Sequence, residues 1–546
     1  MKKFKISILF LLVSIFAFSQ GQYRTPVRPT QNLIVMVADG TSLPVLSAAR
    51  WFKIYNNLGN NLHIDPFICG TVKTFNSNSP IPCSAPAASA FFTGVPARAG
   101  NISIYPLADP ENDILFQFDP ARAYQPLATI LEAARIDQQK AVGLVVTCDF
   151  THATPAAAAA HHYSRGARRD IARQMAHQNL DVMFGSGIRD VSQDMKNHFA
   201  RKNITYIAND IDAFRRFESG KVWALWNEIA LPYELDRNPE TIPSLREMTE
   251  KAIELLSQNE NGFFLMVEGS QIDWLAHAND AGGIIAEFLA FDNAVGAALE
   301  FAKKDGNTTV VILSDHGNSG FSIGVRGMDF GAATLSRMFG PISNFRRTAT
   351  GMNVIMRNTA PENVKATMKE YTGIELTYEE FHSILTATGY NAGNLPKNPN
   401  RTLHATLLQI MNSRSYFGFT TTGHTGEEVF LAAFHPQGDI PLGMNTNVEI
   451  NHYLVDVLGL PRTLNDLTNE IFAKHTEVFA GLRYSIVKRG ETVELEVRNR
   501  RNTLRIPAHS SVAYFNGEAF DLGSVAVYME RNETFYVPRK LAGKLR

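Results

Sequence analysis

The chain of 546 residues contains only three cysteines, Cys69, Cys83 and Cys148. An odd number leaves at least one thiol without an intramolecular partner, and a chain of this length can build its core without a disulfide framework. We therefore expect three buried, reduced thiols, with one disulfide bridge left open as the alternative.

The sequence also has no excess of charge of either sign, since its formal net charge is −1 and its pI is about 7.0. Nucleic acids and anionic membrane surfaces attract strongly basic proteins. The composition therefore implies no nucleic-acid partner. A hydrophobic content of 45% is typical of a folded globular protein and argues against disorder.

An apolar run near the N-terminus, Ile6–Phe18, follows three lysines. It is short for a membrane span, and no charged stop follows it. Ala17 and Ser19 form a small-x-small cleavage pattern, so we expect a signal peptide over residues 1–20, removed near Ser19 or Gln20. No cysteine directly follows this run, which argues against a lipid anchor there. We predict a periplasmic or secreted protein whose mature chain has no membrane span.

Apolar runs typical of strands alternate with helical patterns from residue 30 to about 320. For example, a helix is expected at Leu127–Ala134 and a buried strand at Val142–Val146. Apolar residues from Ile284 to Ala302 recur in steps of three and four, which indicates one face of a helix before the strand at Thr309–Leu313. Repeated helix–strand order implies βαβ units. We predict an α/β fold with a doubly wound, largely parallel central sheet flanked by helices.

The alternation stops at about residue 325, and residues 325–415 are interpreted as an insertion. Helices are expected at Pro361–Tyr371 and Tyr378–Ala387, followed by a loop at Tyr390–Asn400, before strand character returns at Glu428–Phe434. The insertion could cap a site or build a subunit interface, or it could be a surface elaboration; the sequence leaves these alternatives open.

Residues 479–546 have a different pattern, with apolar and charged residues alternating around Val493–Val497. Asn516-Gly517 is a strong turn signal between two alternating segments. We predict a catalytic region at 21–478 and a small antiparallel β-rich module at 479–546.

Carboxylates and imidazoles gather where the predicted strands end. Asp39 follows an apolar run, Glu268 ends a second one, and Asp315-His316 follows a third. In an open α/β sheet, ligands and catalytic groups collect at the carboxyl ends of the strands. Carboxylate and imidazole ligands suit zinc or magnesium, so the pattern indicates a metalloenzyme.

Further donors lie outside these strand ends. Asp273 and His277 are four residues apart, which places them on one helix face, although such a pair is by itself more often an ordinary surface or capping pair. His424 lies in a loop between two glycines. Thr154 offers a hydroxyl to a hard cation such as Mg²⁺, and as an alternative it could cap the helix that begins at Pro155; both roles are compatible.

Ser84 opens a short predicted helix that closes at Gly94. A helix N-terminus favours a bound phosphate and a serine alkoxide, although a serine there is more often simply a cap. Arg165 follows a polyalanine helix, and its guanidinium fork suits two phosphate oxygens. The alternative is an arginine that faces solvent.

Taken together, the motifs resemble those of the metal-dependent alkaline phosphatases, the serine-nucleophile phosphomonoesterases of the alkaline phosphatase superfamily. In chain order they are Val37–Gly40, Ser84–Val95, Thr151–Pro155, Met266–Gly269 with Ile272-Asp273 and His277–Asp280, Ser314–His316, and Thr422–Gly426. The resemblance covers roughly residues 30–320 and 415–460.

The resemblance implies hydrolysis of phosphate monoesters through a phosphoserine on Ser84, with Arg165 binding the phosphoryl oxygens. It also implies two Zn²⁺ ions and one Mg²⁺ ion, and it allows a homodimer. The implied ligands are Asp273, His277 and His424 for the first zinc, Asp39, Asp315 and His316 with Ser84 for the second, and Asp39, Thr154 and Glu268 for magnesium.

Three positions beside the implied site depart from the family pattern or vary within it. Cys83 stands where relatives usually have Asp, and as an alternative it could itself be a nucleophile or a zinc ligand. Trp274 stands where relatives often have Lys or His, and His152 occupies a position that varies between Asp and His. We expect these differences to affect rate and pH optimum. A phosphodiesterase, a sulfatase and an inactive binding protein are the competing interpretations; Thr154 and Glu268 favour the monoesterase.

Overall fold

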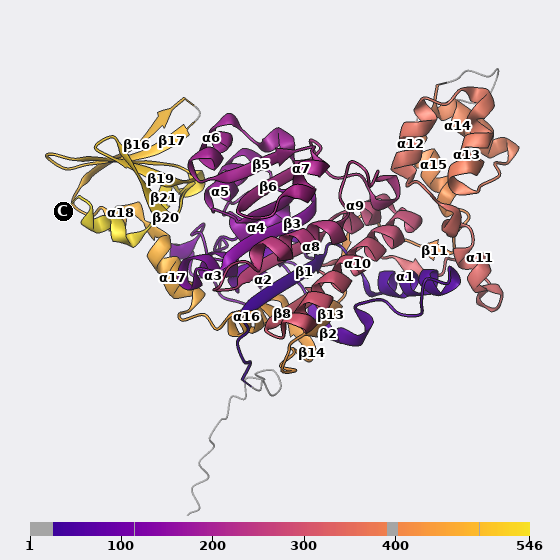
Figure 1. The fold of residues 1–546 in the computed structure, drawn as a ribbon, viewed down its shortest axis with the longest axis horizontal. Helices are drawn as coiled ribbons and strands as arrows, with labels where there is room; N and C mark the ends of the chain where they lie inside the picture. The colour runs from indigo at the N-terminus through magenta and orange to yellow at the C-terminus, as the bar shows by residue number, and fades with distance from the viewer. Residues whose placement is uncertain (1–25, 114, 390–401, 491, 546) are drawn as a thin grey trace, which may run out of the picture.

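The computed structural model describes residues 26–113, 115–389, 402–490 and 492–545. The predicted signal peptide and the predicted loop at Tyr390–Asn400 lie outside these residues. Figure 1 shows a central sheet between layers of helices, a group of helices at one end and a second sheet at the other. This arrangement confirms the predicted α/β fold.

The central sheet has ten strands. In spatial order they are β14 (Gly443–Thr446), β2 (Ile68–Lys73), β13 (Val429–Phe434), β8 (Thr308–Leu313), β1 (Asn32–Ala38), β7 (Phe263–Gly269), β3 (Ala141–Asp149), β4 (Val182–Ser186), β6 (Lys221–Trp226) and β5 (Ile204–Ala208). Neighbouring strands are parallel except at β13, which is antiparallel to both β2 and β8. The sheet is therefore mixed, although largely parallel as predicted.

Helices bury both faces of this sheet. Along β1 the side chains alternate: Ile34, Met36 and Ala38 enter one hydrophobic core, while Leu33 and Val35 enter the other. The first core contains helices α1 (Leu43–Tyr55), α8 (Leu245–Leu256) and α10 (Ala281–Asp305), and the second contains α2 (Ser84–Thr93), α3 (Ile130–Gln138), α4 (Ala153–Ala159), α5 (Arg168–His177) and α16 (Asn447–Leu458). Strands buried on both faces explain the continuous apolar runs in the sequence.

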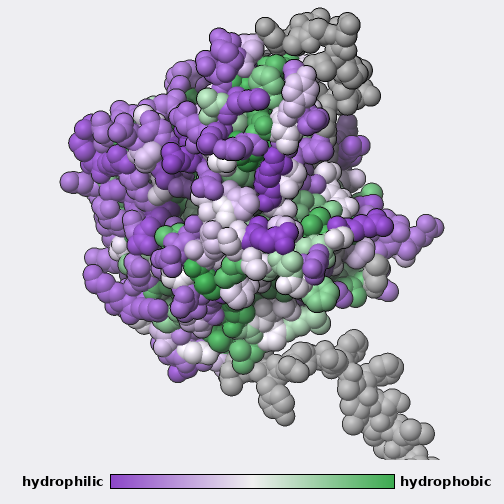
Figure 2. Space-filling model, turned by 90° about the vertical axis from the view of Figure 1, so that its right-hand side faces the viewer, coloured by the Kyte–Doolittle hydropathy of each residue, from purple (hydrophilic) through white to green (hydrophobic). Residues whose placement is uncertain are grey.

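The insertion is helical. Its helices are α11 (Leu335–Phe339), α12 (Ala349–Arg357), α13 (Val364–Thr372), α14 (Tyr378–Ala387) and α15 (Leu403–Asn412). The insertion is tied to the central α/β layers where the Asp280 carboxylate accepts a hydrogen bond from the Ala349 amide at 2.9 Å. Figure 2 shows the end of the molecule that carries these helices: it is mostly hydrophilic, with smaller hydrophobic patches.

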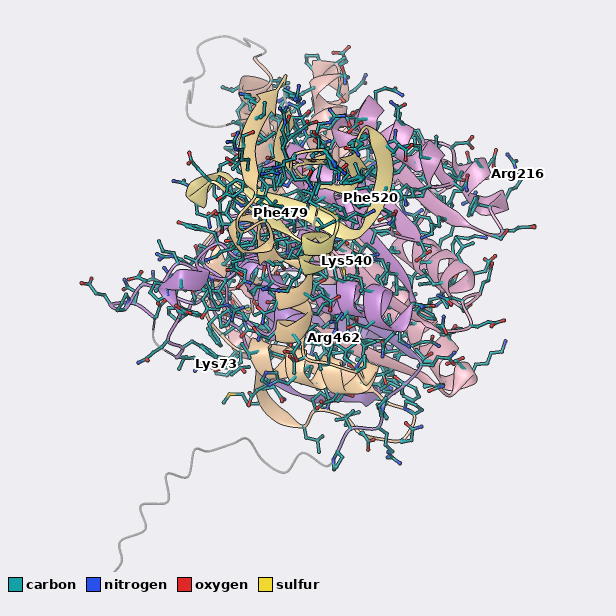
Figure 3. All side chains as sticks on the ribbon, turned by 90° about the vertical axis from the view of Figure 1, so that its left-hand side faces the viewer. Lys73, Arg216, Arg462, Phe479, Phe520 and Lys540 are labelled. Carbon is teal, nitrogen blue, oxygen red and sulfur yellow. The ribbon has the colours of Figure 1, made fainter. Side chains whose placement is uncertain are left out.

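The C-terminal residues form a seven-stranded antiparallel sheet. Its strands are β15 (Ala473–Lys474), β16 (Arg483–Arg489), β17 (Thr492–Arg498), β18 (Thr503–Pro507), β19 (Ser510–Phe515), β20 (Glu518–Met529) and β21 (Thr534–Val537). Asn516 and Gly517 connect β19 to β20 with φ of 52° and 92°, which confirms the predicted turn. Phe479, which ends helix α18 (His475–Val478), is buried in the core beside this sheet, and Phe520 of β20 packs against that core (Figure 3).

The three cysteines form no disulfide, as expected. Cys148 is buried, but Cys69 and Cys83 are only partly buried, so the prediction of three fully buried thiols was wrong for these two. Among the described residues, no helix has the length and apolar character needed to cross a membrane.

Candidate metal centre

Candidate metal-binding side chains lie at the carboxyl ends of four adjacent strands, β8, β1, β7 and β3, and those on the first three strands were predicted. Asp39 directly follows β1, Glu268 lies near the end of β7, and Asp315-His316 follows β8. Cys148 lies in the same position on β3. Because these strands are parallel, their ends meet at one edge of the sheet.

One cluster contains Asp39, Asp315 and His316, whose donor atoms lie within 4.8 Å of one another. The His316 Nε2 atom is 3.4 Å from Asp39 Oδ1 and 3.5 Å from Asp315 Oδ2. The Ser84 Oγ atom is 3.2 Å from the same nitrogen. Ser84 is the first residue of α2 and is only 1% exposed, and the helix N-cap is Cys83, whose side chain makes no capping hydrogen bond.

A second cluster adjoins the first. The His277 Nε2 atom is 3.5 Å from Asp273 Oδ2, and the His424 Nε2 atom is 3.7 Å from Asp273 Oδ1. Helix α9 (Gln271–Ala278) places Asp273 and His277 on one face, as predicted from their spacing. His424 is positioned by antiparallel backbone pairing with Asn318, which lies two residues after His316 in the chain.

The three imidazoles share one tautomer. Each Nδ1 atom faces a backbone carbonyl oxygen: Thr422 at 2.6 Å for His277, Pro82 at 2.9 Å for His424 and Gly317 at 3.1 Å for His316. A carbonyl can only accept, so each Nδ1 carries the proton and each Nε2 presents a lone pair to the cluster. The Nε2 atoms of His277 and His424 are 3.1 Å apart. Two facing lone pairs repel each other unless a cation lies beside them, so these residues fit a metal ion.

The buried carboxylates fit cations as well. Among the described atoms, both side-chain oxygens of Asp39 and one oxygen each of Asp315 and Glu268 are buried without a hydrogen-bond partner. Burial, and then repulsion from Asp315 and Asp273, raises the pKa of Asp39 well above its usual value. Burial likewise raises the pKa of Glu268 to about 7. Uncompensated buried charge is costly, and a divalent cation would offset it.

A third cluster contains Cys148, His152 and Glu268. The Cys148 thiol donates a hydrogen bond to Glu268 Oε2 at 3.5 Å, and the Thr154 hydroxyl is buried and unpaired among the described residues. The alternative role of Thr154 as a helix cap is wrong, because the N-cap of α4 is His152. Sequence reasoning missed Cys148 as a donor, although its place at the end of the predicted strand after Val142 is the same signal that marked the carboxylates.

Arg165 points toward the cluster, so the solvent-facing alternative is wrong. Its Nη1 atom donates to Cys83 Sγ at 3.1 Å and its Nη2 atom to His152 Nε2 at 3.2 Å. The His152 ring in turn meets Trp274 edge-on, with ring centroids 5.7 Å apart. Burial and then the Arg165 charge lower the pKa of His152 to about 3, so this imidazole is neutral.

Gly40 allows the carboxylates to approach one another. Its φ is +63°, and a Cβ atom there would lie 2.5 Å from Asp273 Oδ1. The Gly40 amide also donates to Asp315 Oδ1 at 3.1 Å. Only glycine can hold this position without moving the two ligand-bearing segments apart.

A largely parallel α/β sheet with carboxylates, imidazoles and a buried serine gathered at its carboxyl edge defines a metal-dependent hydrolase. The model of the family described as alkaline phosphatase matches residues 30–460. The chain is 31% identical to alkaline phosphatase 4 of Bacillus subtilis over 442 residues, which cover 78% of this chain and 88% of that protein. It is also 31% identical to alkaline phosphatase 3 of the same organism over 452 residues, covering 80% and 90%.

Solved structures share the fold. The cold-active alkaline phosphatase of a Shewanella species superposes with a TM-score of 0.68 at 28% identity, covering 78% of this chain and 99% of that one. The Thermus thermophilus alkaline phosphatase gives the same TM-score at 24% identity, covering 81% and 93%. The chain therefore belongs to the alkaline phosphatase family, whose members are metal-dependent phosphomonoesterases.

Proposed function

We propose that this chain hydrolyses phosphate monoesters through a covalent phosphoserine on Ser84. The observation that carries the proposal is the position of the Ser84 hydroxyl. It is buried at the N-terminus of α2, 3.2 Å from His316 Nε2, which is itself beside the carboxylates of Asp39 and Asp315.

The proposed zinc ligands are the two clusters of carboxylates and imidazoles. Asp273, His277 and His424 would hold one zinc ion, and Asp39, Asp315 and His316 the other, with Ser84 beside it. A third ion fits beside Asp39, Thr154 and Glu268, where the family resemblance implies magnesium. Bound divalent cations would supply Lewis acidity that favours the serine alkoxide, the leaving oxygen and an attacking water.

The side chains of the chain perform the remaining steps. The Ser84 hydroxyl loses its proton, its oxygen attacks phosphorus in line, and the P–O ester bond breaks. The leaving oxygen takes up a proton and departs as an alcohol. Water then attacks the phosphoserine, which releases inorganic phosphate and returns the hydroxyl to Ser84. The backbone N–H groups at the start of α2 and the guanidinium of Arg165 stabilise the phosphoryl oxygens during both steps.

The test of the nucleophile is Ser84→Ala. We expect hydrolysis of nitrophenyl phosphate to fall at least about 1000-fold, and we expect acid-quenched wild type, but not the variant, to carry phosphate on the peptide that contains Ser84. Ser89→Ala is the matched control, because Ser89 lies buried on the same helix and bonds the Ala85 carbonyl instead. An unchanged rate in Ser84→Ala would remove Ser84 from the mechanism.

Substrate class is tested by comparing the nitrophenyl phosphate monoester with its methyl diester. Arg165 offers two donors to the oxygens of the transferred group, and a diester has one fewer free oxygen to receive them. We expect faster turnover of the monoester. Faster diester turnover would make the protein a phosphodiesterase, and no turnover of either by metal-loaded protein would favour an inactive binding protein.

Export, domain division and assembly are further parts of the proposal. The pattern at residues 1–20 supports export to the periplasm or medium. The proposed catalytic region is 21–478, and the proposed β-rich module is 479–546. The proposed assembly is a homodimer. Mass spectrometry of the mature N-terminus tests the first point. Sedimentation of the purified protein tests the last.

A further inference from the structure

We propose that the third metal site of this chain takes zinc, not magnesium, with the Cys148 thiolate as a direct ligand. The inference deepens the proposed function, on which it rests, because the third ion belongs to the same catalytic site. It concerns which cation the donors of this chain select.

The chemistry of the donor set supports zinc. Cys148, His152 and Glu268 offer a sulfur, a nitrogen and an oxygen atom within 4.8 Å of one another. Magnesium requires near-octahedral oxygen ligands and keeps much of its water, whereas zinc binds thiolate, imidazole and carboxylate in a four-coordinate arrangement. With the Thr154 hydroxyl as the fourth donor, the set matches zinc in number and in softness.

The donor atoms of Cys148, His152 and Glu268 lie close together. The Cys148 thiol, which is fully buried, lies 3.3 Å from the Asp149 carbonyl oxygen and 3.5 Å from Glu268 Oε2. The other Glu268 oxygen, the Thr154 hydroxyl and the Nδ1 atom of His152 are buried and have no hydrogen-bond partner among the described residues. Three unpaired polar atoms around one buried thiol fit a metal ion better than a packed polar core.

The same geometry couples this site to Arg165. The guanidinium donates to His152 Nε2 at 3.2 Å, so in this state the imidazole carries its proton on Nδ1. Ligation through Nε2 occupies the lone pair that Arg165 uses, and ligation through Nδ1 moves the proton to Nε2. Either way the Nη2 group of Arg165 leaves His152 and becomes available to phosphate, while Nη1 keeps its contact with Cys83 Sγ.

The experiment is a cobalt spectrum of the full chain. Cobalt replaces zinc in most zinc sites, and a thiolate ligand gives a charge-transfer band in the near ultraviolet that carboxylate and imidazole ligands do not give. We expect this band in wild type and in Ser84→Ala. We expect it to disappear in Cys148→Ser and in Cys148→Ala, and to persist in the matched controls Cys69→Ser and Cys83→Ser.

Metal content provides a second measurement, independent of the spectrum. Wild type dialysed against zinc with excess magnesium should hold three zinc ions per chain, and Cys148→Ser should hold two zinc ions and one magnesium ion. We expect the substitution to weaken zinc at the third site by roughly 100-fold. Magnesium at that site in wild type, a spectrum without the thiolate band, or a band that depends on Cys83 would overturn the inference.

These outcomes are separate from failure of the proposed function. Phosphomonoesterase activity that depends on Ser84, without a thiolate band, would leave the function in place and remove Cys148 from the site. A thiolate band without hydrolytic activity would do the reverse.

Discussion

Replacing Asp39 with asparagine should change the stability of the protein in opposite directions without and with metal. In the metal-depleted protein, the Asp39 carboxylate is buried and has no hydrogen-bond partner among the described residues. Burial, together with repulsion from Asp315, Asp273 and Glu268, raises its pKa well above the usual value. Asp39→Asn keeps the shape and removes the charge. We therefore expect the variant to be more stable than wild type without metal and less stable with zinc.

The magnitude follows from the cost of folding with this carboxyl. An unfolded aspartate has a pKa of about 3.9, and each pKa unit corresponds to about 1.4 kcal/mol, so protonating Asp39 at pH 7 costs about 4 kcal/mol. That is the upper limit of the gain, because an amide does not restore every hydrogen bond. We expect the free energy of unfolding of the metal-depleted variant to rise by about 2 kcal/mol at pH 7.

The pH dependence has a definite sign. A carboxyl whose pKa is raised by folding stabilises the folded state fully below its unfolded pKa, and that contribution is lost as pH rises. Urea unfolding at pH 5 and pH 8 should therefore show a larger gain for metal-depleted Asp39→Asn at pH 8. With zinc present, the variant should lose stability and metal content.

The control is Asp292→Asn, because Asp292 is also buried but accepts hydrogen bonds from the amides of His63 and Ile64, outside the clusters. This control should lose stability to a similar extent with and without metal. If metal-depleted Asp39→Asn loses as much stability as Asp292→Asn, the carboxylates do not repel one another as argued.

Three further predictions follow from individual side chains. Burial lowers the pKa of His198 to about 4 and of His509 to about 3, so the unfolded chain binds protons that the folded chain excludes. The free energy of unfolding should therefore fall by roughly 5 kcal/mol between pH 6.5 and pH 4, and a flat urea-unfolding profile over this range would contradict it. Gly40→Ala should destabilise the fold by about 2 kcal/mol or more and reduce zinc content, because the Cβ atom of the alanine would lie against Asp273. An unchanged thermal unfolding temperature together with an unchanged zinc content would refute this prediction. Arg165→Ala should raise both KM for nitrophenyl phosphate and the inhibition constant of inorganic phosphate by about 10-fold. An unchanged inhibition constant would exclude Arg165 from phosphate binding.

Local patterns in the sequence were sufficient for much of the fold. The helix predicted at Tyr378–Ala387 has these bounds in the structure, because Thr377 and Glu380 form a capping box at its start. The helix predicted at Pro361–Tyr371 begins instead as a 3₁₀ turn and becomes α-helical at Val364. Where hydrogen bonds between residues three or four apart decide the bounds of a helix, those bounds can be predicted from the sequence.

The direction of β13 was not predictable in this way. The run at Glu428–Phe434 has the apolar character of any buried strand, and that character is the same for parallel and antiparallel pairing. Its antiparallel course between β2 and β8 depends on the path of the chain through the insertion, which leaves the sheet after Asp315-His316 and returns at His424.

The sequence by itself determined which donors the chain offers and at which strand and helix ends they stand, because the end of an apolar run and an i, i+4 spacing are short-range properties. Only the tertiary structure decided which donors meet. His424 reaches the centre through its pair with Asn318 and its Nδ1 contact with the Pro82 carbonyl, 342 residues earlier in the chain. Cys148 faces Glu268 because β3 and β7 are neighbours in the sheet. Such contacts depend on strand order, which no spacing within one segment can encode.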